Sequence, residues 1–124
     1  MKLTQLDFYL QFEKILFKIE EYLNTFHGKN DIDYEINNNI MTISFQKNNK
    51  IIINKQTALK QIWLATKKNG YHFNYENFNW ICNRTKRNIW NILEESFYTQ
   101  GKEKVNFSNL YDKNDFKNNK NFKK

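Results

Sequence analysis

The segment IIINKQTALKQIWLATKKNGYHFNY, residues 51–75, decides the fold of this 124-residue chain. The segment opens with three Ile at 51–53, and further strand-like runs follow at 60–66 and, after the Asn69–Gly70 pair, at 71–75. Short runs rich in Ile, Tyr and Phe, separated by Asn and Gly, are typical of β-strands joined by tight turns. Because tight turns connect antiparallel neighbours, the segment predicts three successive strands of an antiparallel sheet.

The pattern of strands continues on both sides of this segment. Residues 31–36, DIDYEI, alternate strictly between acidic and apolar side chains, so the apolar ones share one face of a strand. Three Asn at 37–39 predict a turn, since Asn tolerates a positive φ, and 40–45 form the next strand. Residues 78–83 supply a last strand. The sequence therefore predicts a six-stranded, mostly antiparallel meander.

Helical spacing flanks the strands at both ends of the chain. Apolar residues recur every three or four positions over residues 4–26 and again over 86–100. The first stripe comprises Phe8, Phe12, Ile15, Leu16, Ile19, Leu23 and Phe26, and the second Ile89, Trp90, Leu93 and Phe97. Each stripe must be buried against another element. The predicted fold class is α+β, a two-layer sandwich with both helices packed on one face of the sheet.

The chain is expected to hold a single domain, residues 1–100, followed by a Lys- and Asn-rich tail, residues 101–124. Apolar residues are scattered in this tail without a period. We therefore expect the tail to be loosely ordered. Cys82 alternates with Trp80 in the last strand and is expected to be a core residue rather than a nucleophile.

Composition excludes several classes of protein. One Cys cannot make a disulfide scaffold or a thiolate cluster site, and two His cannot make a His-rich metal site. The apolar runs are too short for a membrane span, and the N-terminus lacks the apolar core of a signal peptide, so we expect no membrane partner and a cytoplasmic location. The net charge of +7 is uneven, because residues 1–43 carry −3 while 44–100 carry +6 and 101–124 carry +4.

A group of acidic residues in the negatively charged first part of the chain is the first candidate site. Its members are Glu20, Glu21, Asp31, Asp33 and Glu35. Alternate residues of a strand stand about 7 Å apart on one face, and an oxygen-seeking cation could offset their repulsion. Carboxylates without thiolates suit a hard ion such as Mg²⁺, Ca²⁺, Mn²⁺ or iron. The alternative is a solvated strand face, which the pattern alone favours.

Trp63 is the second candidate. Ile62 and Leu64 belong toward the helices, which drives Trp63 to the open face of the sheet beside Gln61. A Trp among amides on a flat sheet offers a large rigid contact area for another protein. The alternative is that neighbouring side chains or the tail cover it.

The run INKQTALKQIWLAT, residues 53–66, followed by NGYHF, residues 69–73, resembles the signature of the frataxin family, most closely its bacterial branch. Residues 31–37 and 80–84 are similar to the strands that flank this signature in the family. The resemblance covers about residues 5–100. It implies the same helix–sheet–helix sandwich and a regulator of iron–sulfur cluster assembly.

The resemblance also implies particular sites. Family members bind iron weakly at an acidic ridge, which falls here on Glu20, Glu21, Asp31, Asp33 and Glu35. The partners it implies are a cysteine desulfurase and an iron–sulfur scaffold protein. The family's contact surface on the sheet falls on Asn54, Gln56, Gln61 and Trp63. Positions such as Asn24 and His27 stand where bacterial relatives carry acids, so the ridge is depleted.

Other functions stay open at this stage. One alternative is a ferroxidase or iron-storage activity, which the open ridge disfavours; we expect a non-catalytic protein, monomeric or forming iron-dependent oligomers. Another is nucleic-acid binding through the basic surface, which would fall steeply with salt. Codon bias toward Lys and Asn explains that surface more simply, so we do not expect a nucleic-acid partner.

Overall fold

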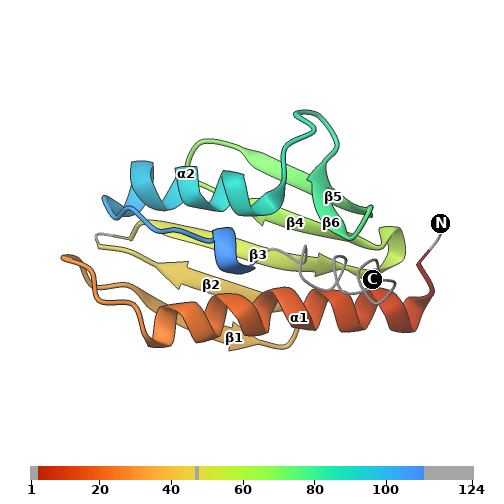
Figure 1. Cartoon of the computed structure of the whole chain (residues 1–124), viewed down its shortest axis with the longest axis horizontal. Helices are drawn as coiled ribbons and strands as arrows, with labels where there is room; N and C mark the ends of the chain where they lie inside the picture. Colours follow the sequence, from red (N-terminus) through yellow and green to blue (C-terminus); the bar gives the residue numbers. More distant parts are fainter. Residues whose placement is uncertain (1–2, 47, 111–124) are drawn as a thin grey trace, which may run out of the picture.

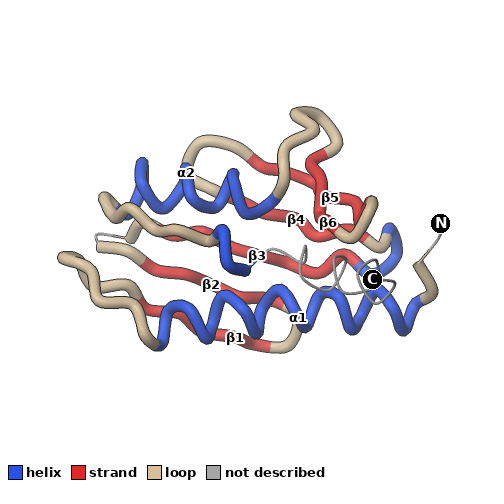
Figure 2. The backbone as a smooth tube through the Cα atoms, viewed as in Figure 1, coloured by secondary structure: helices blue, strands red, loops and turns tan. Residues whose placement is uncertain are grey.

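The computed structural model describes residues 3–46 and 48–110, which fold into two helices lying on a six-stranded sheet (Figure 1, Figure 2). The helices are α1 (Gln5–Asn24) and α2 (Ile89–Gly101), with short 3-10 turns η1 (Thr57–Leu59) and η2 (Ser108–Leu110). The strands are β1 (Asp33–Asn37), β2 (Ile40–Ser44), β3 (Lys50–Gln56), β4 (Gln61–Ala65), β5 (Gly70–Glu76) and β6 (Asn79–Cys82). Within the described ranges, no helix has the length and hydrophobicity needed to cross a membrane.

The sheet is a plain antiparallel meander with the strand order β1-β2-β3-β4-β5-β6. Both helices lie on the same face of it, α1 over the β1 side and α2 over the other half (Figure 1). The predicted α+β sandwich is therefore confirmed. Within residues 3–46 and 48–110, no helix lies on the opposite face of the sheet.

The core lies between the helices and the covered face of the sheet. Its sheet members are Met41, Ile43, Ile51, Ile53, Ile62, Leu64, Phe73, Trp80 and Cys82, all buried. The helices contribute Phe8, Phe12, Ile15, Leu16 and Ile19 from α1, and Ile89, Trp90, Ile92, Leu93 and Phe97 from α2. Thr4 caps α1, since its Oγ1 accepts a hydrogen bond from the Asp7 backbone N–H at 3.0 Å. These residues confirm the second predicted stripe and the first as far as Ile19, whereas Leu23 and Phe26 are only partly buried and Phe26 lies beyond the end of α1 at Asn24.

Strand β3 is longer than the predicted strand at 51–53. It continues through Asn54 and Gln56, whose backbones pair with Trp63 and Gln61 of β4. The sequence pattern missed this extension because amide side chains are depleted in strands, whereas backbone pairing depends on the neighbouring strand. The extension matters for function, since it carries the polar residues predicted to contact a partner.

Helix α2 begins at Ile89, three residues after the predicted start at 86. Lys86 has a φ of 62°, which is incompatible with a right-handed helix. Asn88 caps the helix instead, and its Oδ1 accepts a hydrogen bond from the backbone N–H of Trp90 at 2.9 Å. Residues 83–87 consequently form a loop that lies between β6 and α2.

The sequence predicts a loosely ordered tail from residue 101 onward. This prediction is wrong for the residues just after α2, which pack against the helices. Val105 and Phe107 are buried, and the Phe107 ring lies 4.9 to 5.5 Å from the rings of Tyr22, Trp90 and Phe97. The carboxylate of Glu103 accepts a hydrogen bond from the backbone N–H of Asn30, which ties the segment to the loop after α1. Residues 102–107 run between the two helices, and every second residue, Glu103, Val105 and Phe107, is buried. We call this segment the strap. Residues 111–124 of the predicted tail lie outside the described residues.

Candidate functional site

The four predicted contact residues lie together on the open face of the sheet. Asn54 of β3 stands opposite Trp63 of β4, and Gln56 stands opposite Gln61. All four side chains are half-buried, as expected for groups on a sheet face that neither described helix covers. The structure therefore brings the predicted set into one contiguous patch, which we call the Trp63 face.

Trp63 is held in one orientation by its neighbours. Its indole ring is stacked on the imidazole of His72, with ring centroids 4.2 Å apart and planes inclined by 10°. The indole Nε1 donates a hydrogen bond to Oε1 of Gln61 at 2.8 Å. Gln61 in turn donates to Asn74 at 3.2 Å, and Asn74 donates to Asn83. Side chains of the sheet thus support Trp63 while leaving it partly exposed.

His72, Asn74 and Asn83 also belong to this site; the sequence left His72 open between a contact residue and a plain surface His, and it gave no signal for Asn74 or Asn83. His72 stands opposite Trp63 in the β4–β5 pairing, and the Asn83 backbone N–H donates to the His72 carbonyl at 2.9 Å. The row across the sheet therefore runs from Asn54 through Trp63 and His72 to Asn83. Alternation within residues 71–75 could have placed His72 on the open face, but its partner depends on the register between strands.

Apolar side chains border the amides of the Trp63 face. Ile40 stands opposite Asn54 and is 39% exposed, and Ile52 stands opposite Ala65 and is 37% exposed. Strands β2 to β4 thus present aliphatic, aromatic and amide groups without a charged side chain at the row's centre. Such a mixture, with few charges at the core, is characteristic of protein–protein contact surfaces.

The predicted metal-binding acids are divided between the two faces of β1. The Tyr34 hydroxyl donates a hydrogen bond to Oε2 of Glu20 at 3.1 Å and lies 2.8 Å from Oδ1 of Asn24, so Tyr34 points toward α1. Burial and the adjacent Glu20 carboxylate raise the pKa of Tyr34. Since Asp33 and Glu35 flank Tyr34 in the strand, they project from the opposite face.

These acids offer separate oxygen ligands rather than one enclosed site. Oε2 of Glu35 accepts a hydrogen bond from the Asn37 amide at 2.7 Å, while Glu21, Asp31 and Asp33 are exposed. Over residues 3–46 and 48–110, no three His, Cys, Asp or Glu side chains gather closely enough to hold a metal ion. The geometry suits loose attraction of a hydrated cation at a surface of oxygen ligands.

Cys82 is a core residue, as predicted, and is 1% exposed. Burial raises the pKa of its thiol, but hydrogen bonds from the Thr85 side chain and from the backbone of Thr85 and Arg84 outweigh burial. With the nearby Arg84 charge, they leave the pKa lowered overall. No chemistry needs to be assigned to a thiol that solvent does not reach.

Comparison with known proteins defines the class to which this sheet and its open face belong. Residues 1–103 match the sequence profile of the family described as the frataxin-like domain. The chain belongs to this family. The family resemblance predicted from residues 53–73 is therefore confirmed.

Several relatives resemble the chain over most of its length. The "Iron-sulfur cluster assembly protein CyaY" of Buchnera aphidicola subsp. Baizongia pistaciae is 50% identical over 99 residues, covering 79% of this chain and 84% of the relative. The protein of the same name from Buchnera aphidicola subsp. Acyrthosiphon pisum is 48% identical over 101 residues, covering 82% and 87%.

Solved structures agree with the fold. The frataxin of Psychromonas ingrahamii has a TM-score of 0.78 and 34% identity, covering 86% of this chain and 99% of that one. A trimeric frataxin from Saccharomyces cerevisiae, complexed with ferrous iron, has a TM-score of 0.61 and 27% identity, covering 82% and 89%.

Proposed function

We propose that this chain is an accessory protein of iron–sulfur cluster assembly that regulates the process without catalysing it. The observation that carries the proposal is its 50% identity, over most of both chains, to a relative named as an iron–sulfur cluster assembly protein. Family membership over residues 1–103 supports the same role. In this proposal the Trp63 face binds a protein partner and the acidic residues bind a cation.

The Trp63 face is the proposed docking surface for the cysteine desulfurase and its scaffold protein. Three features support this assignment: both helices of the described residues lie on the other face of the sheet, Trp63 is fixed by His72 and Gln61, and apolar groups lie beside it. Rigid aromatic anchors surrounded by amides and aliphatic groups commonly dominate the affinity of protein contacts. Docking through such a face requires no change in the fold.

The acidic residues are the proposed site of weak iron binding. Glu20, Glu21, Asp31, Asp33 and Glu35 provide hard oxygen donors, which iron accepts. The ferrous complex of the yeast relative supports a cation role for the fold. Because these carboxylates are spread over two faces and are largely exposed, the affinity they supply should be low and sensitive to salt.

Neutralising Asp33 and Glu35 together should weaken Fe²⁺ binding by roughly 30-fold. Each unit charge about 4 Å from a cation contributes about 1 kcal/mol in water, and the variant Asp33→Asn/Glu35→Gln loses two such charges. Anaerobic calorimetry with Fe²⁺ measures the change. The matched control, Glu13→Gln/Glu76→Gln, removes the same net charge elsewhere. Equal weakening in both variants would place iron binding outside β1.

Cluster assembly on the scaffold tests the function itself. The desulfurase and scaffold are mixed with cysteine and iron, and cluster formation is followed by visible absorbance with and without this chain. We expect the chain to change the rate at sub-stoichiometric to stoichiometric amounts, and the change to depend on the iron concentration. An unchanged rate at every iron level, together with no binding to the desulfurase–scaffold complex, would refute the proposed function.

A further inference from the structure

A small polar pocket adjoins the Trp63 face at the start of β5. It has a volume of about 290 Å³ and is lined by Gly70, His72, Asn83 and Arg84. Two of these residues come from β5 and two from the loop that follows β6, and the pocket exists because Asn83 pairs with His72 across the two segments. Its volume is enough for a carboxylate and several waters, since a water occupies about 30 Å³ of liquid.

Arg84 is fixed in this pocket by contacts that do not neutralise it. One guanidinium nitrogen, Nη2, donates a hydrogen bond to the Gly70 carbonyl oxygen at 2.7 Å. The guanidinium carbon also lies 5.9 Å from the centre of the Tyr71 ring. A carbonyl and an aromatic ring orient a guanidinium without removing its charge, so further N–H groups stay available to an anion.

His72 supplies a second oriented donor. Its ring is held by stacking on Trp63, and within the described part of the chain no hydrogen bond to its ring nitrogens is found. The stacked geometry fixes the plane of the imidazole while leaving its edge for a ligand. The pocket therefore combines a guanidinium and an imidazole whose orientations are both set by the fold.

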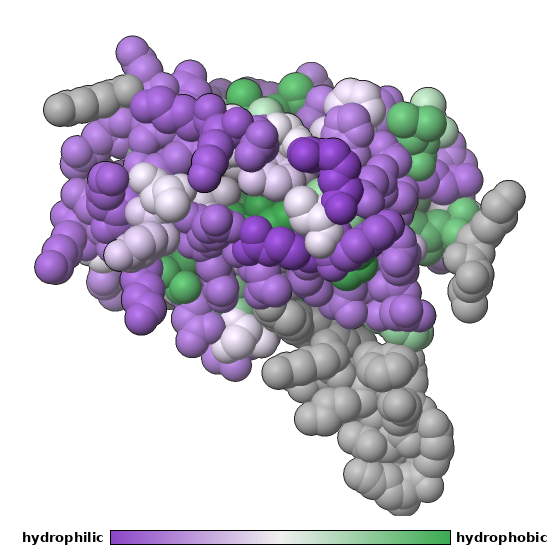
Figure 3. All heavy atoms as spheres, turned by 90° about the horizontal axis from the view of Figure 1, so that it is seen from above, coloured by the Kyte–Doolittle hydropathy of each residue, from purple (hydrophilic) through white to green (hydrophobic). Residues whose placement is uncertain are grey.

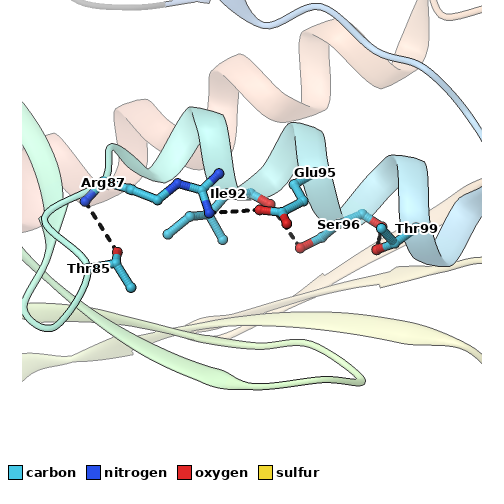
Figure 4. Close-up of polar contacts among 6 residues, drawn as sticks. All are labelled: Thr85, Arg87, Ile92, Glu95, Ser96 and Thr99. Carbon is cyan, nitrogen blue, oxygen red and sulfur yellow. Dashed lines mark hydrogen bonds and ion pairs between the residues drawn. The ribbon is translucent and has the colours of Figure 1, made fainter.

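The charge around the pocket has one sign. None of its four lining residues is acidic. Lys67 and Lys68 precede Gly70 in the β4–β5 turn, and Lys86 and Arg87 follow Arg84 in the next loop. Glu95, an acid that contacts this loop, forms an ion pair of 2.7 Å with Arg87, and Figure 4 shows this contact. The side of the molecule drawn in Figure 3 is mostly hydrophilic, with hydrophobic residues only in separate patches.

We infer that the pocket of His72, Asn83 and Arg84 binds a carboxylate. A guanidinium with one nitrogen already engaged presents its remaining edge as a planar pair of donors, which matches the two oxygens of a carboxylate. The carboxylate could belong to a small polycarboxylate or to an acidic side chain of the protein that docks on the Trp63 face. The second source rests on the proposed function, whereas the first does not.

Citrate titration of the full chain in metal-free buffer tests the site. Calorimetry measures affinity, and NMR shifts of the Asn83 and Arg84 side chains locate the ligand. We expect Arg84→Gln to weaken citrate binding by about tenfold or more, because a charge-assisted pair is lost. The citrate affinity of Arg84→Lys should lie between those of the unmodified chain and Arg84→Gln, since Lys keeps the positive charge but lacks the planar pair of N–H donors. His72→Phe keeps the stack on Trp63 but removes the nitrogens, and it should also weaken binding.

Arg87→Gln is the matched control, since it removes the same charge from the same loop while Arg84 stays in place. It should change citrate affinity by less than about twofold, because exposed charges farther away are screened. Equal losses in Arg84→Gln and Arg87→Gln would overturn the inference in favour of general attraction by a basic surface. Circular dichroism of each variant establishes that its fold is unchanged.

The same variants distinguish the two sources of the carboxylate. If Arg84→Gln lowers the affinity for the desulfurase–scaffold complex while Arg87→Gln does not, the ligand is an acidic side chain of the partner. If it lowers only the affinity for citrate, the ligand is a free carboxylate. No effect on either affinity would overturn the inference. Because the citrate titration needs no partner, its result stands even if the proposed function fails.

Discussion

Replacing Phe107 by alanine should lower the free energy of unfolding by about 3–5 kcal/mol, the range for deleting a buried aromatic side chain. Phe107 is fully buried and its ring packs against Tyr22 of α1 and against Trp90 and Phe97 of α2. Its loss would leave a cavity at the point where the strap meets both helices. Such a loss approaches half of the stability of an average domain.

Urea unfolding, followed by circular dichroism and by fluorescence, measures this change. Phe17→Ala is the matched control, because Phe17 lies on α1 and is 60% exposed. Its unfolding free energy should change by less than about 1 kcal/mol, as for most surface substitutions. A change below about 1 kcal/mol in Phe107→Ala would mean that residues 102–107 are not part of the folding unit.

Trp63→Ala should weaken binding to the desulfurase–scaffold complex by about 30-fold or more, equivalent to roughly 2 kcal/mol for an anchor residue at a protein interface. The variant loses the ring that stacks on His72 and the donor that holds Gln61. Because Trp63 lies on the open face, the core under the helices stays intact, and thermal unfolding should stay cooperative.

Affinity is measured with the purified complex by calorimetry or interferometry. Tyr98→Ala removes another exposed aromatic side chain, 64% exposed on α2, and should leave the affinity unchanged. If both variants bind like the unmodified chain, the partner docks elsewhere. If both are weakened equally, the loss reflects general surface hydrophobicity rather than the Trp63 face.

The parts of the fold that the sequence predicts well are those set by hydrophobic period. The stripe that includes Phe8 and Phe12 predicts α1, and the alternation around Ile62 and Leu64 predicts which way Trp63 points. The errors lie where the period is weak. Asn54 and Gln56 are not typical strand residues, so the pattern did not predict that β3 extends to Gln56. Lys86 has a left-handed backbone conformation, which a Lys in the sequence does not signal, and α2 therefore begins later than predicted.

The strap illustrates a second limit. Val105 and Phe107 alternate with polar residues, but two apolar positions beside Lys and Asn are too few to outweigh the composition of the region. Their burial depends on a gap between Tyr22 and Trp90 that exists only once both helices are in place. Tertiary packing of this kind leaves no local pattern in the sequence.

The candidate sites were predicted to different extents. Alternation placed Gln61 and Trp63 on one face, but the stacking of His72 depends on strand register, and its pocket with Arg84 depends on a loop. The acids form a single group in the sequence, whereas in the structure Glu20 lies on α1, where the Tyr34 hydroxyl binds it, and Asp33 and Glu35 project from the other face of β1. Proximity in the sequence therefore overstated how closely these carboxylates gather in space.

The stack of Trp63 on His72 has a consequence for the thermodynamics of docking. A free surface side chain gives up rotational freedom when a partner immobilises it, at a cost of about 0.5–1.5 kcal/mol. Here the indole is already confined between an imidazole and the Gln61 amide, so folding rather than association bears that entropic penalty. A partner therefore binds a Trp63 side chain that is already in one rotamer, with one ring face free of His72. The contact energy of that ring face then contributes to affinity without a loss of side-chain entropy.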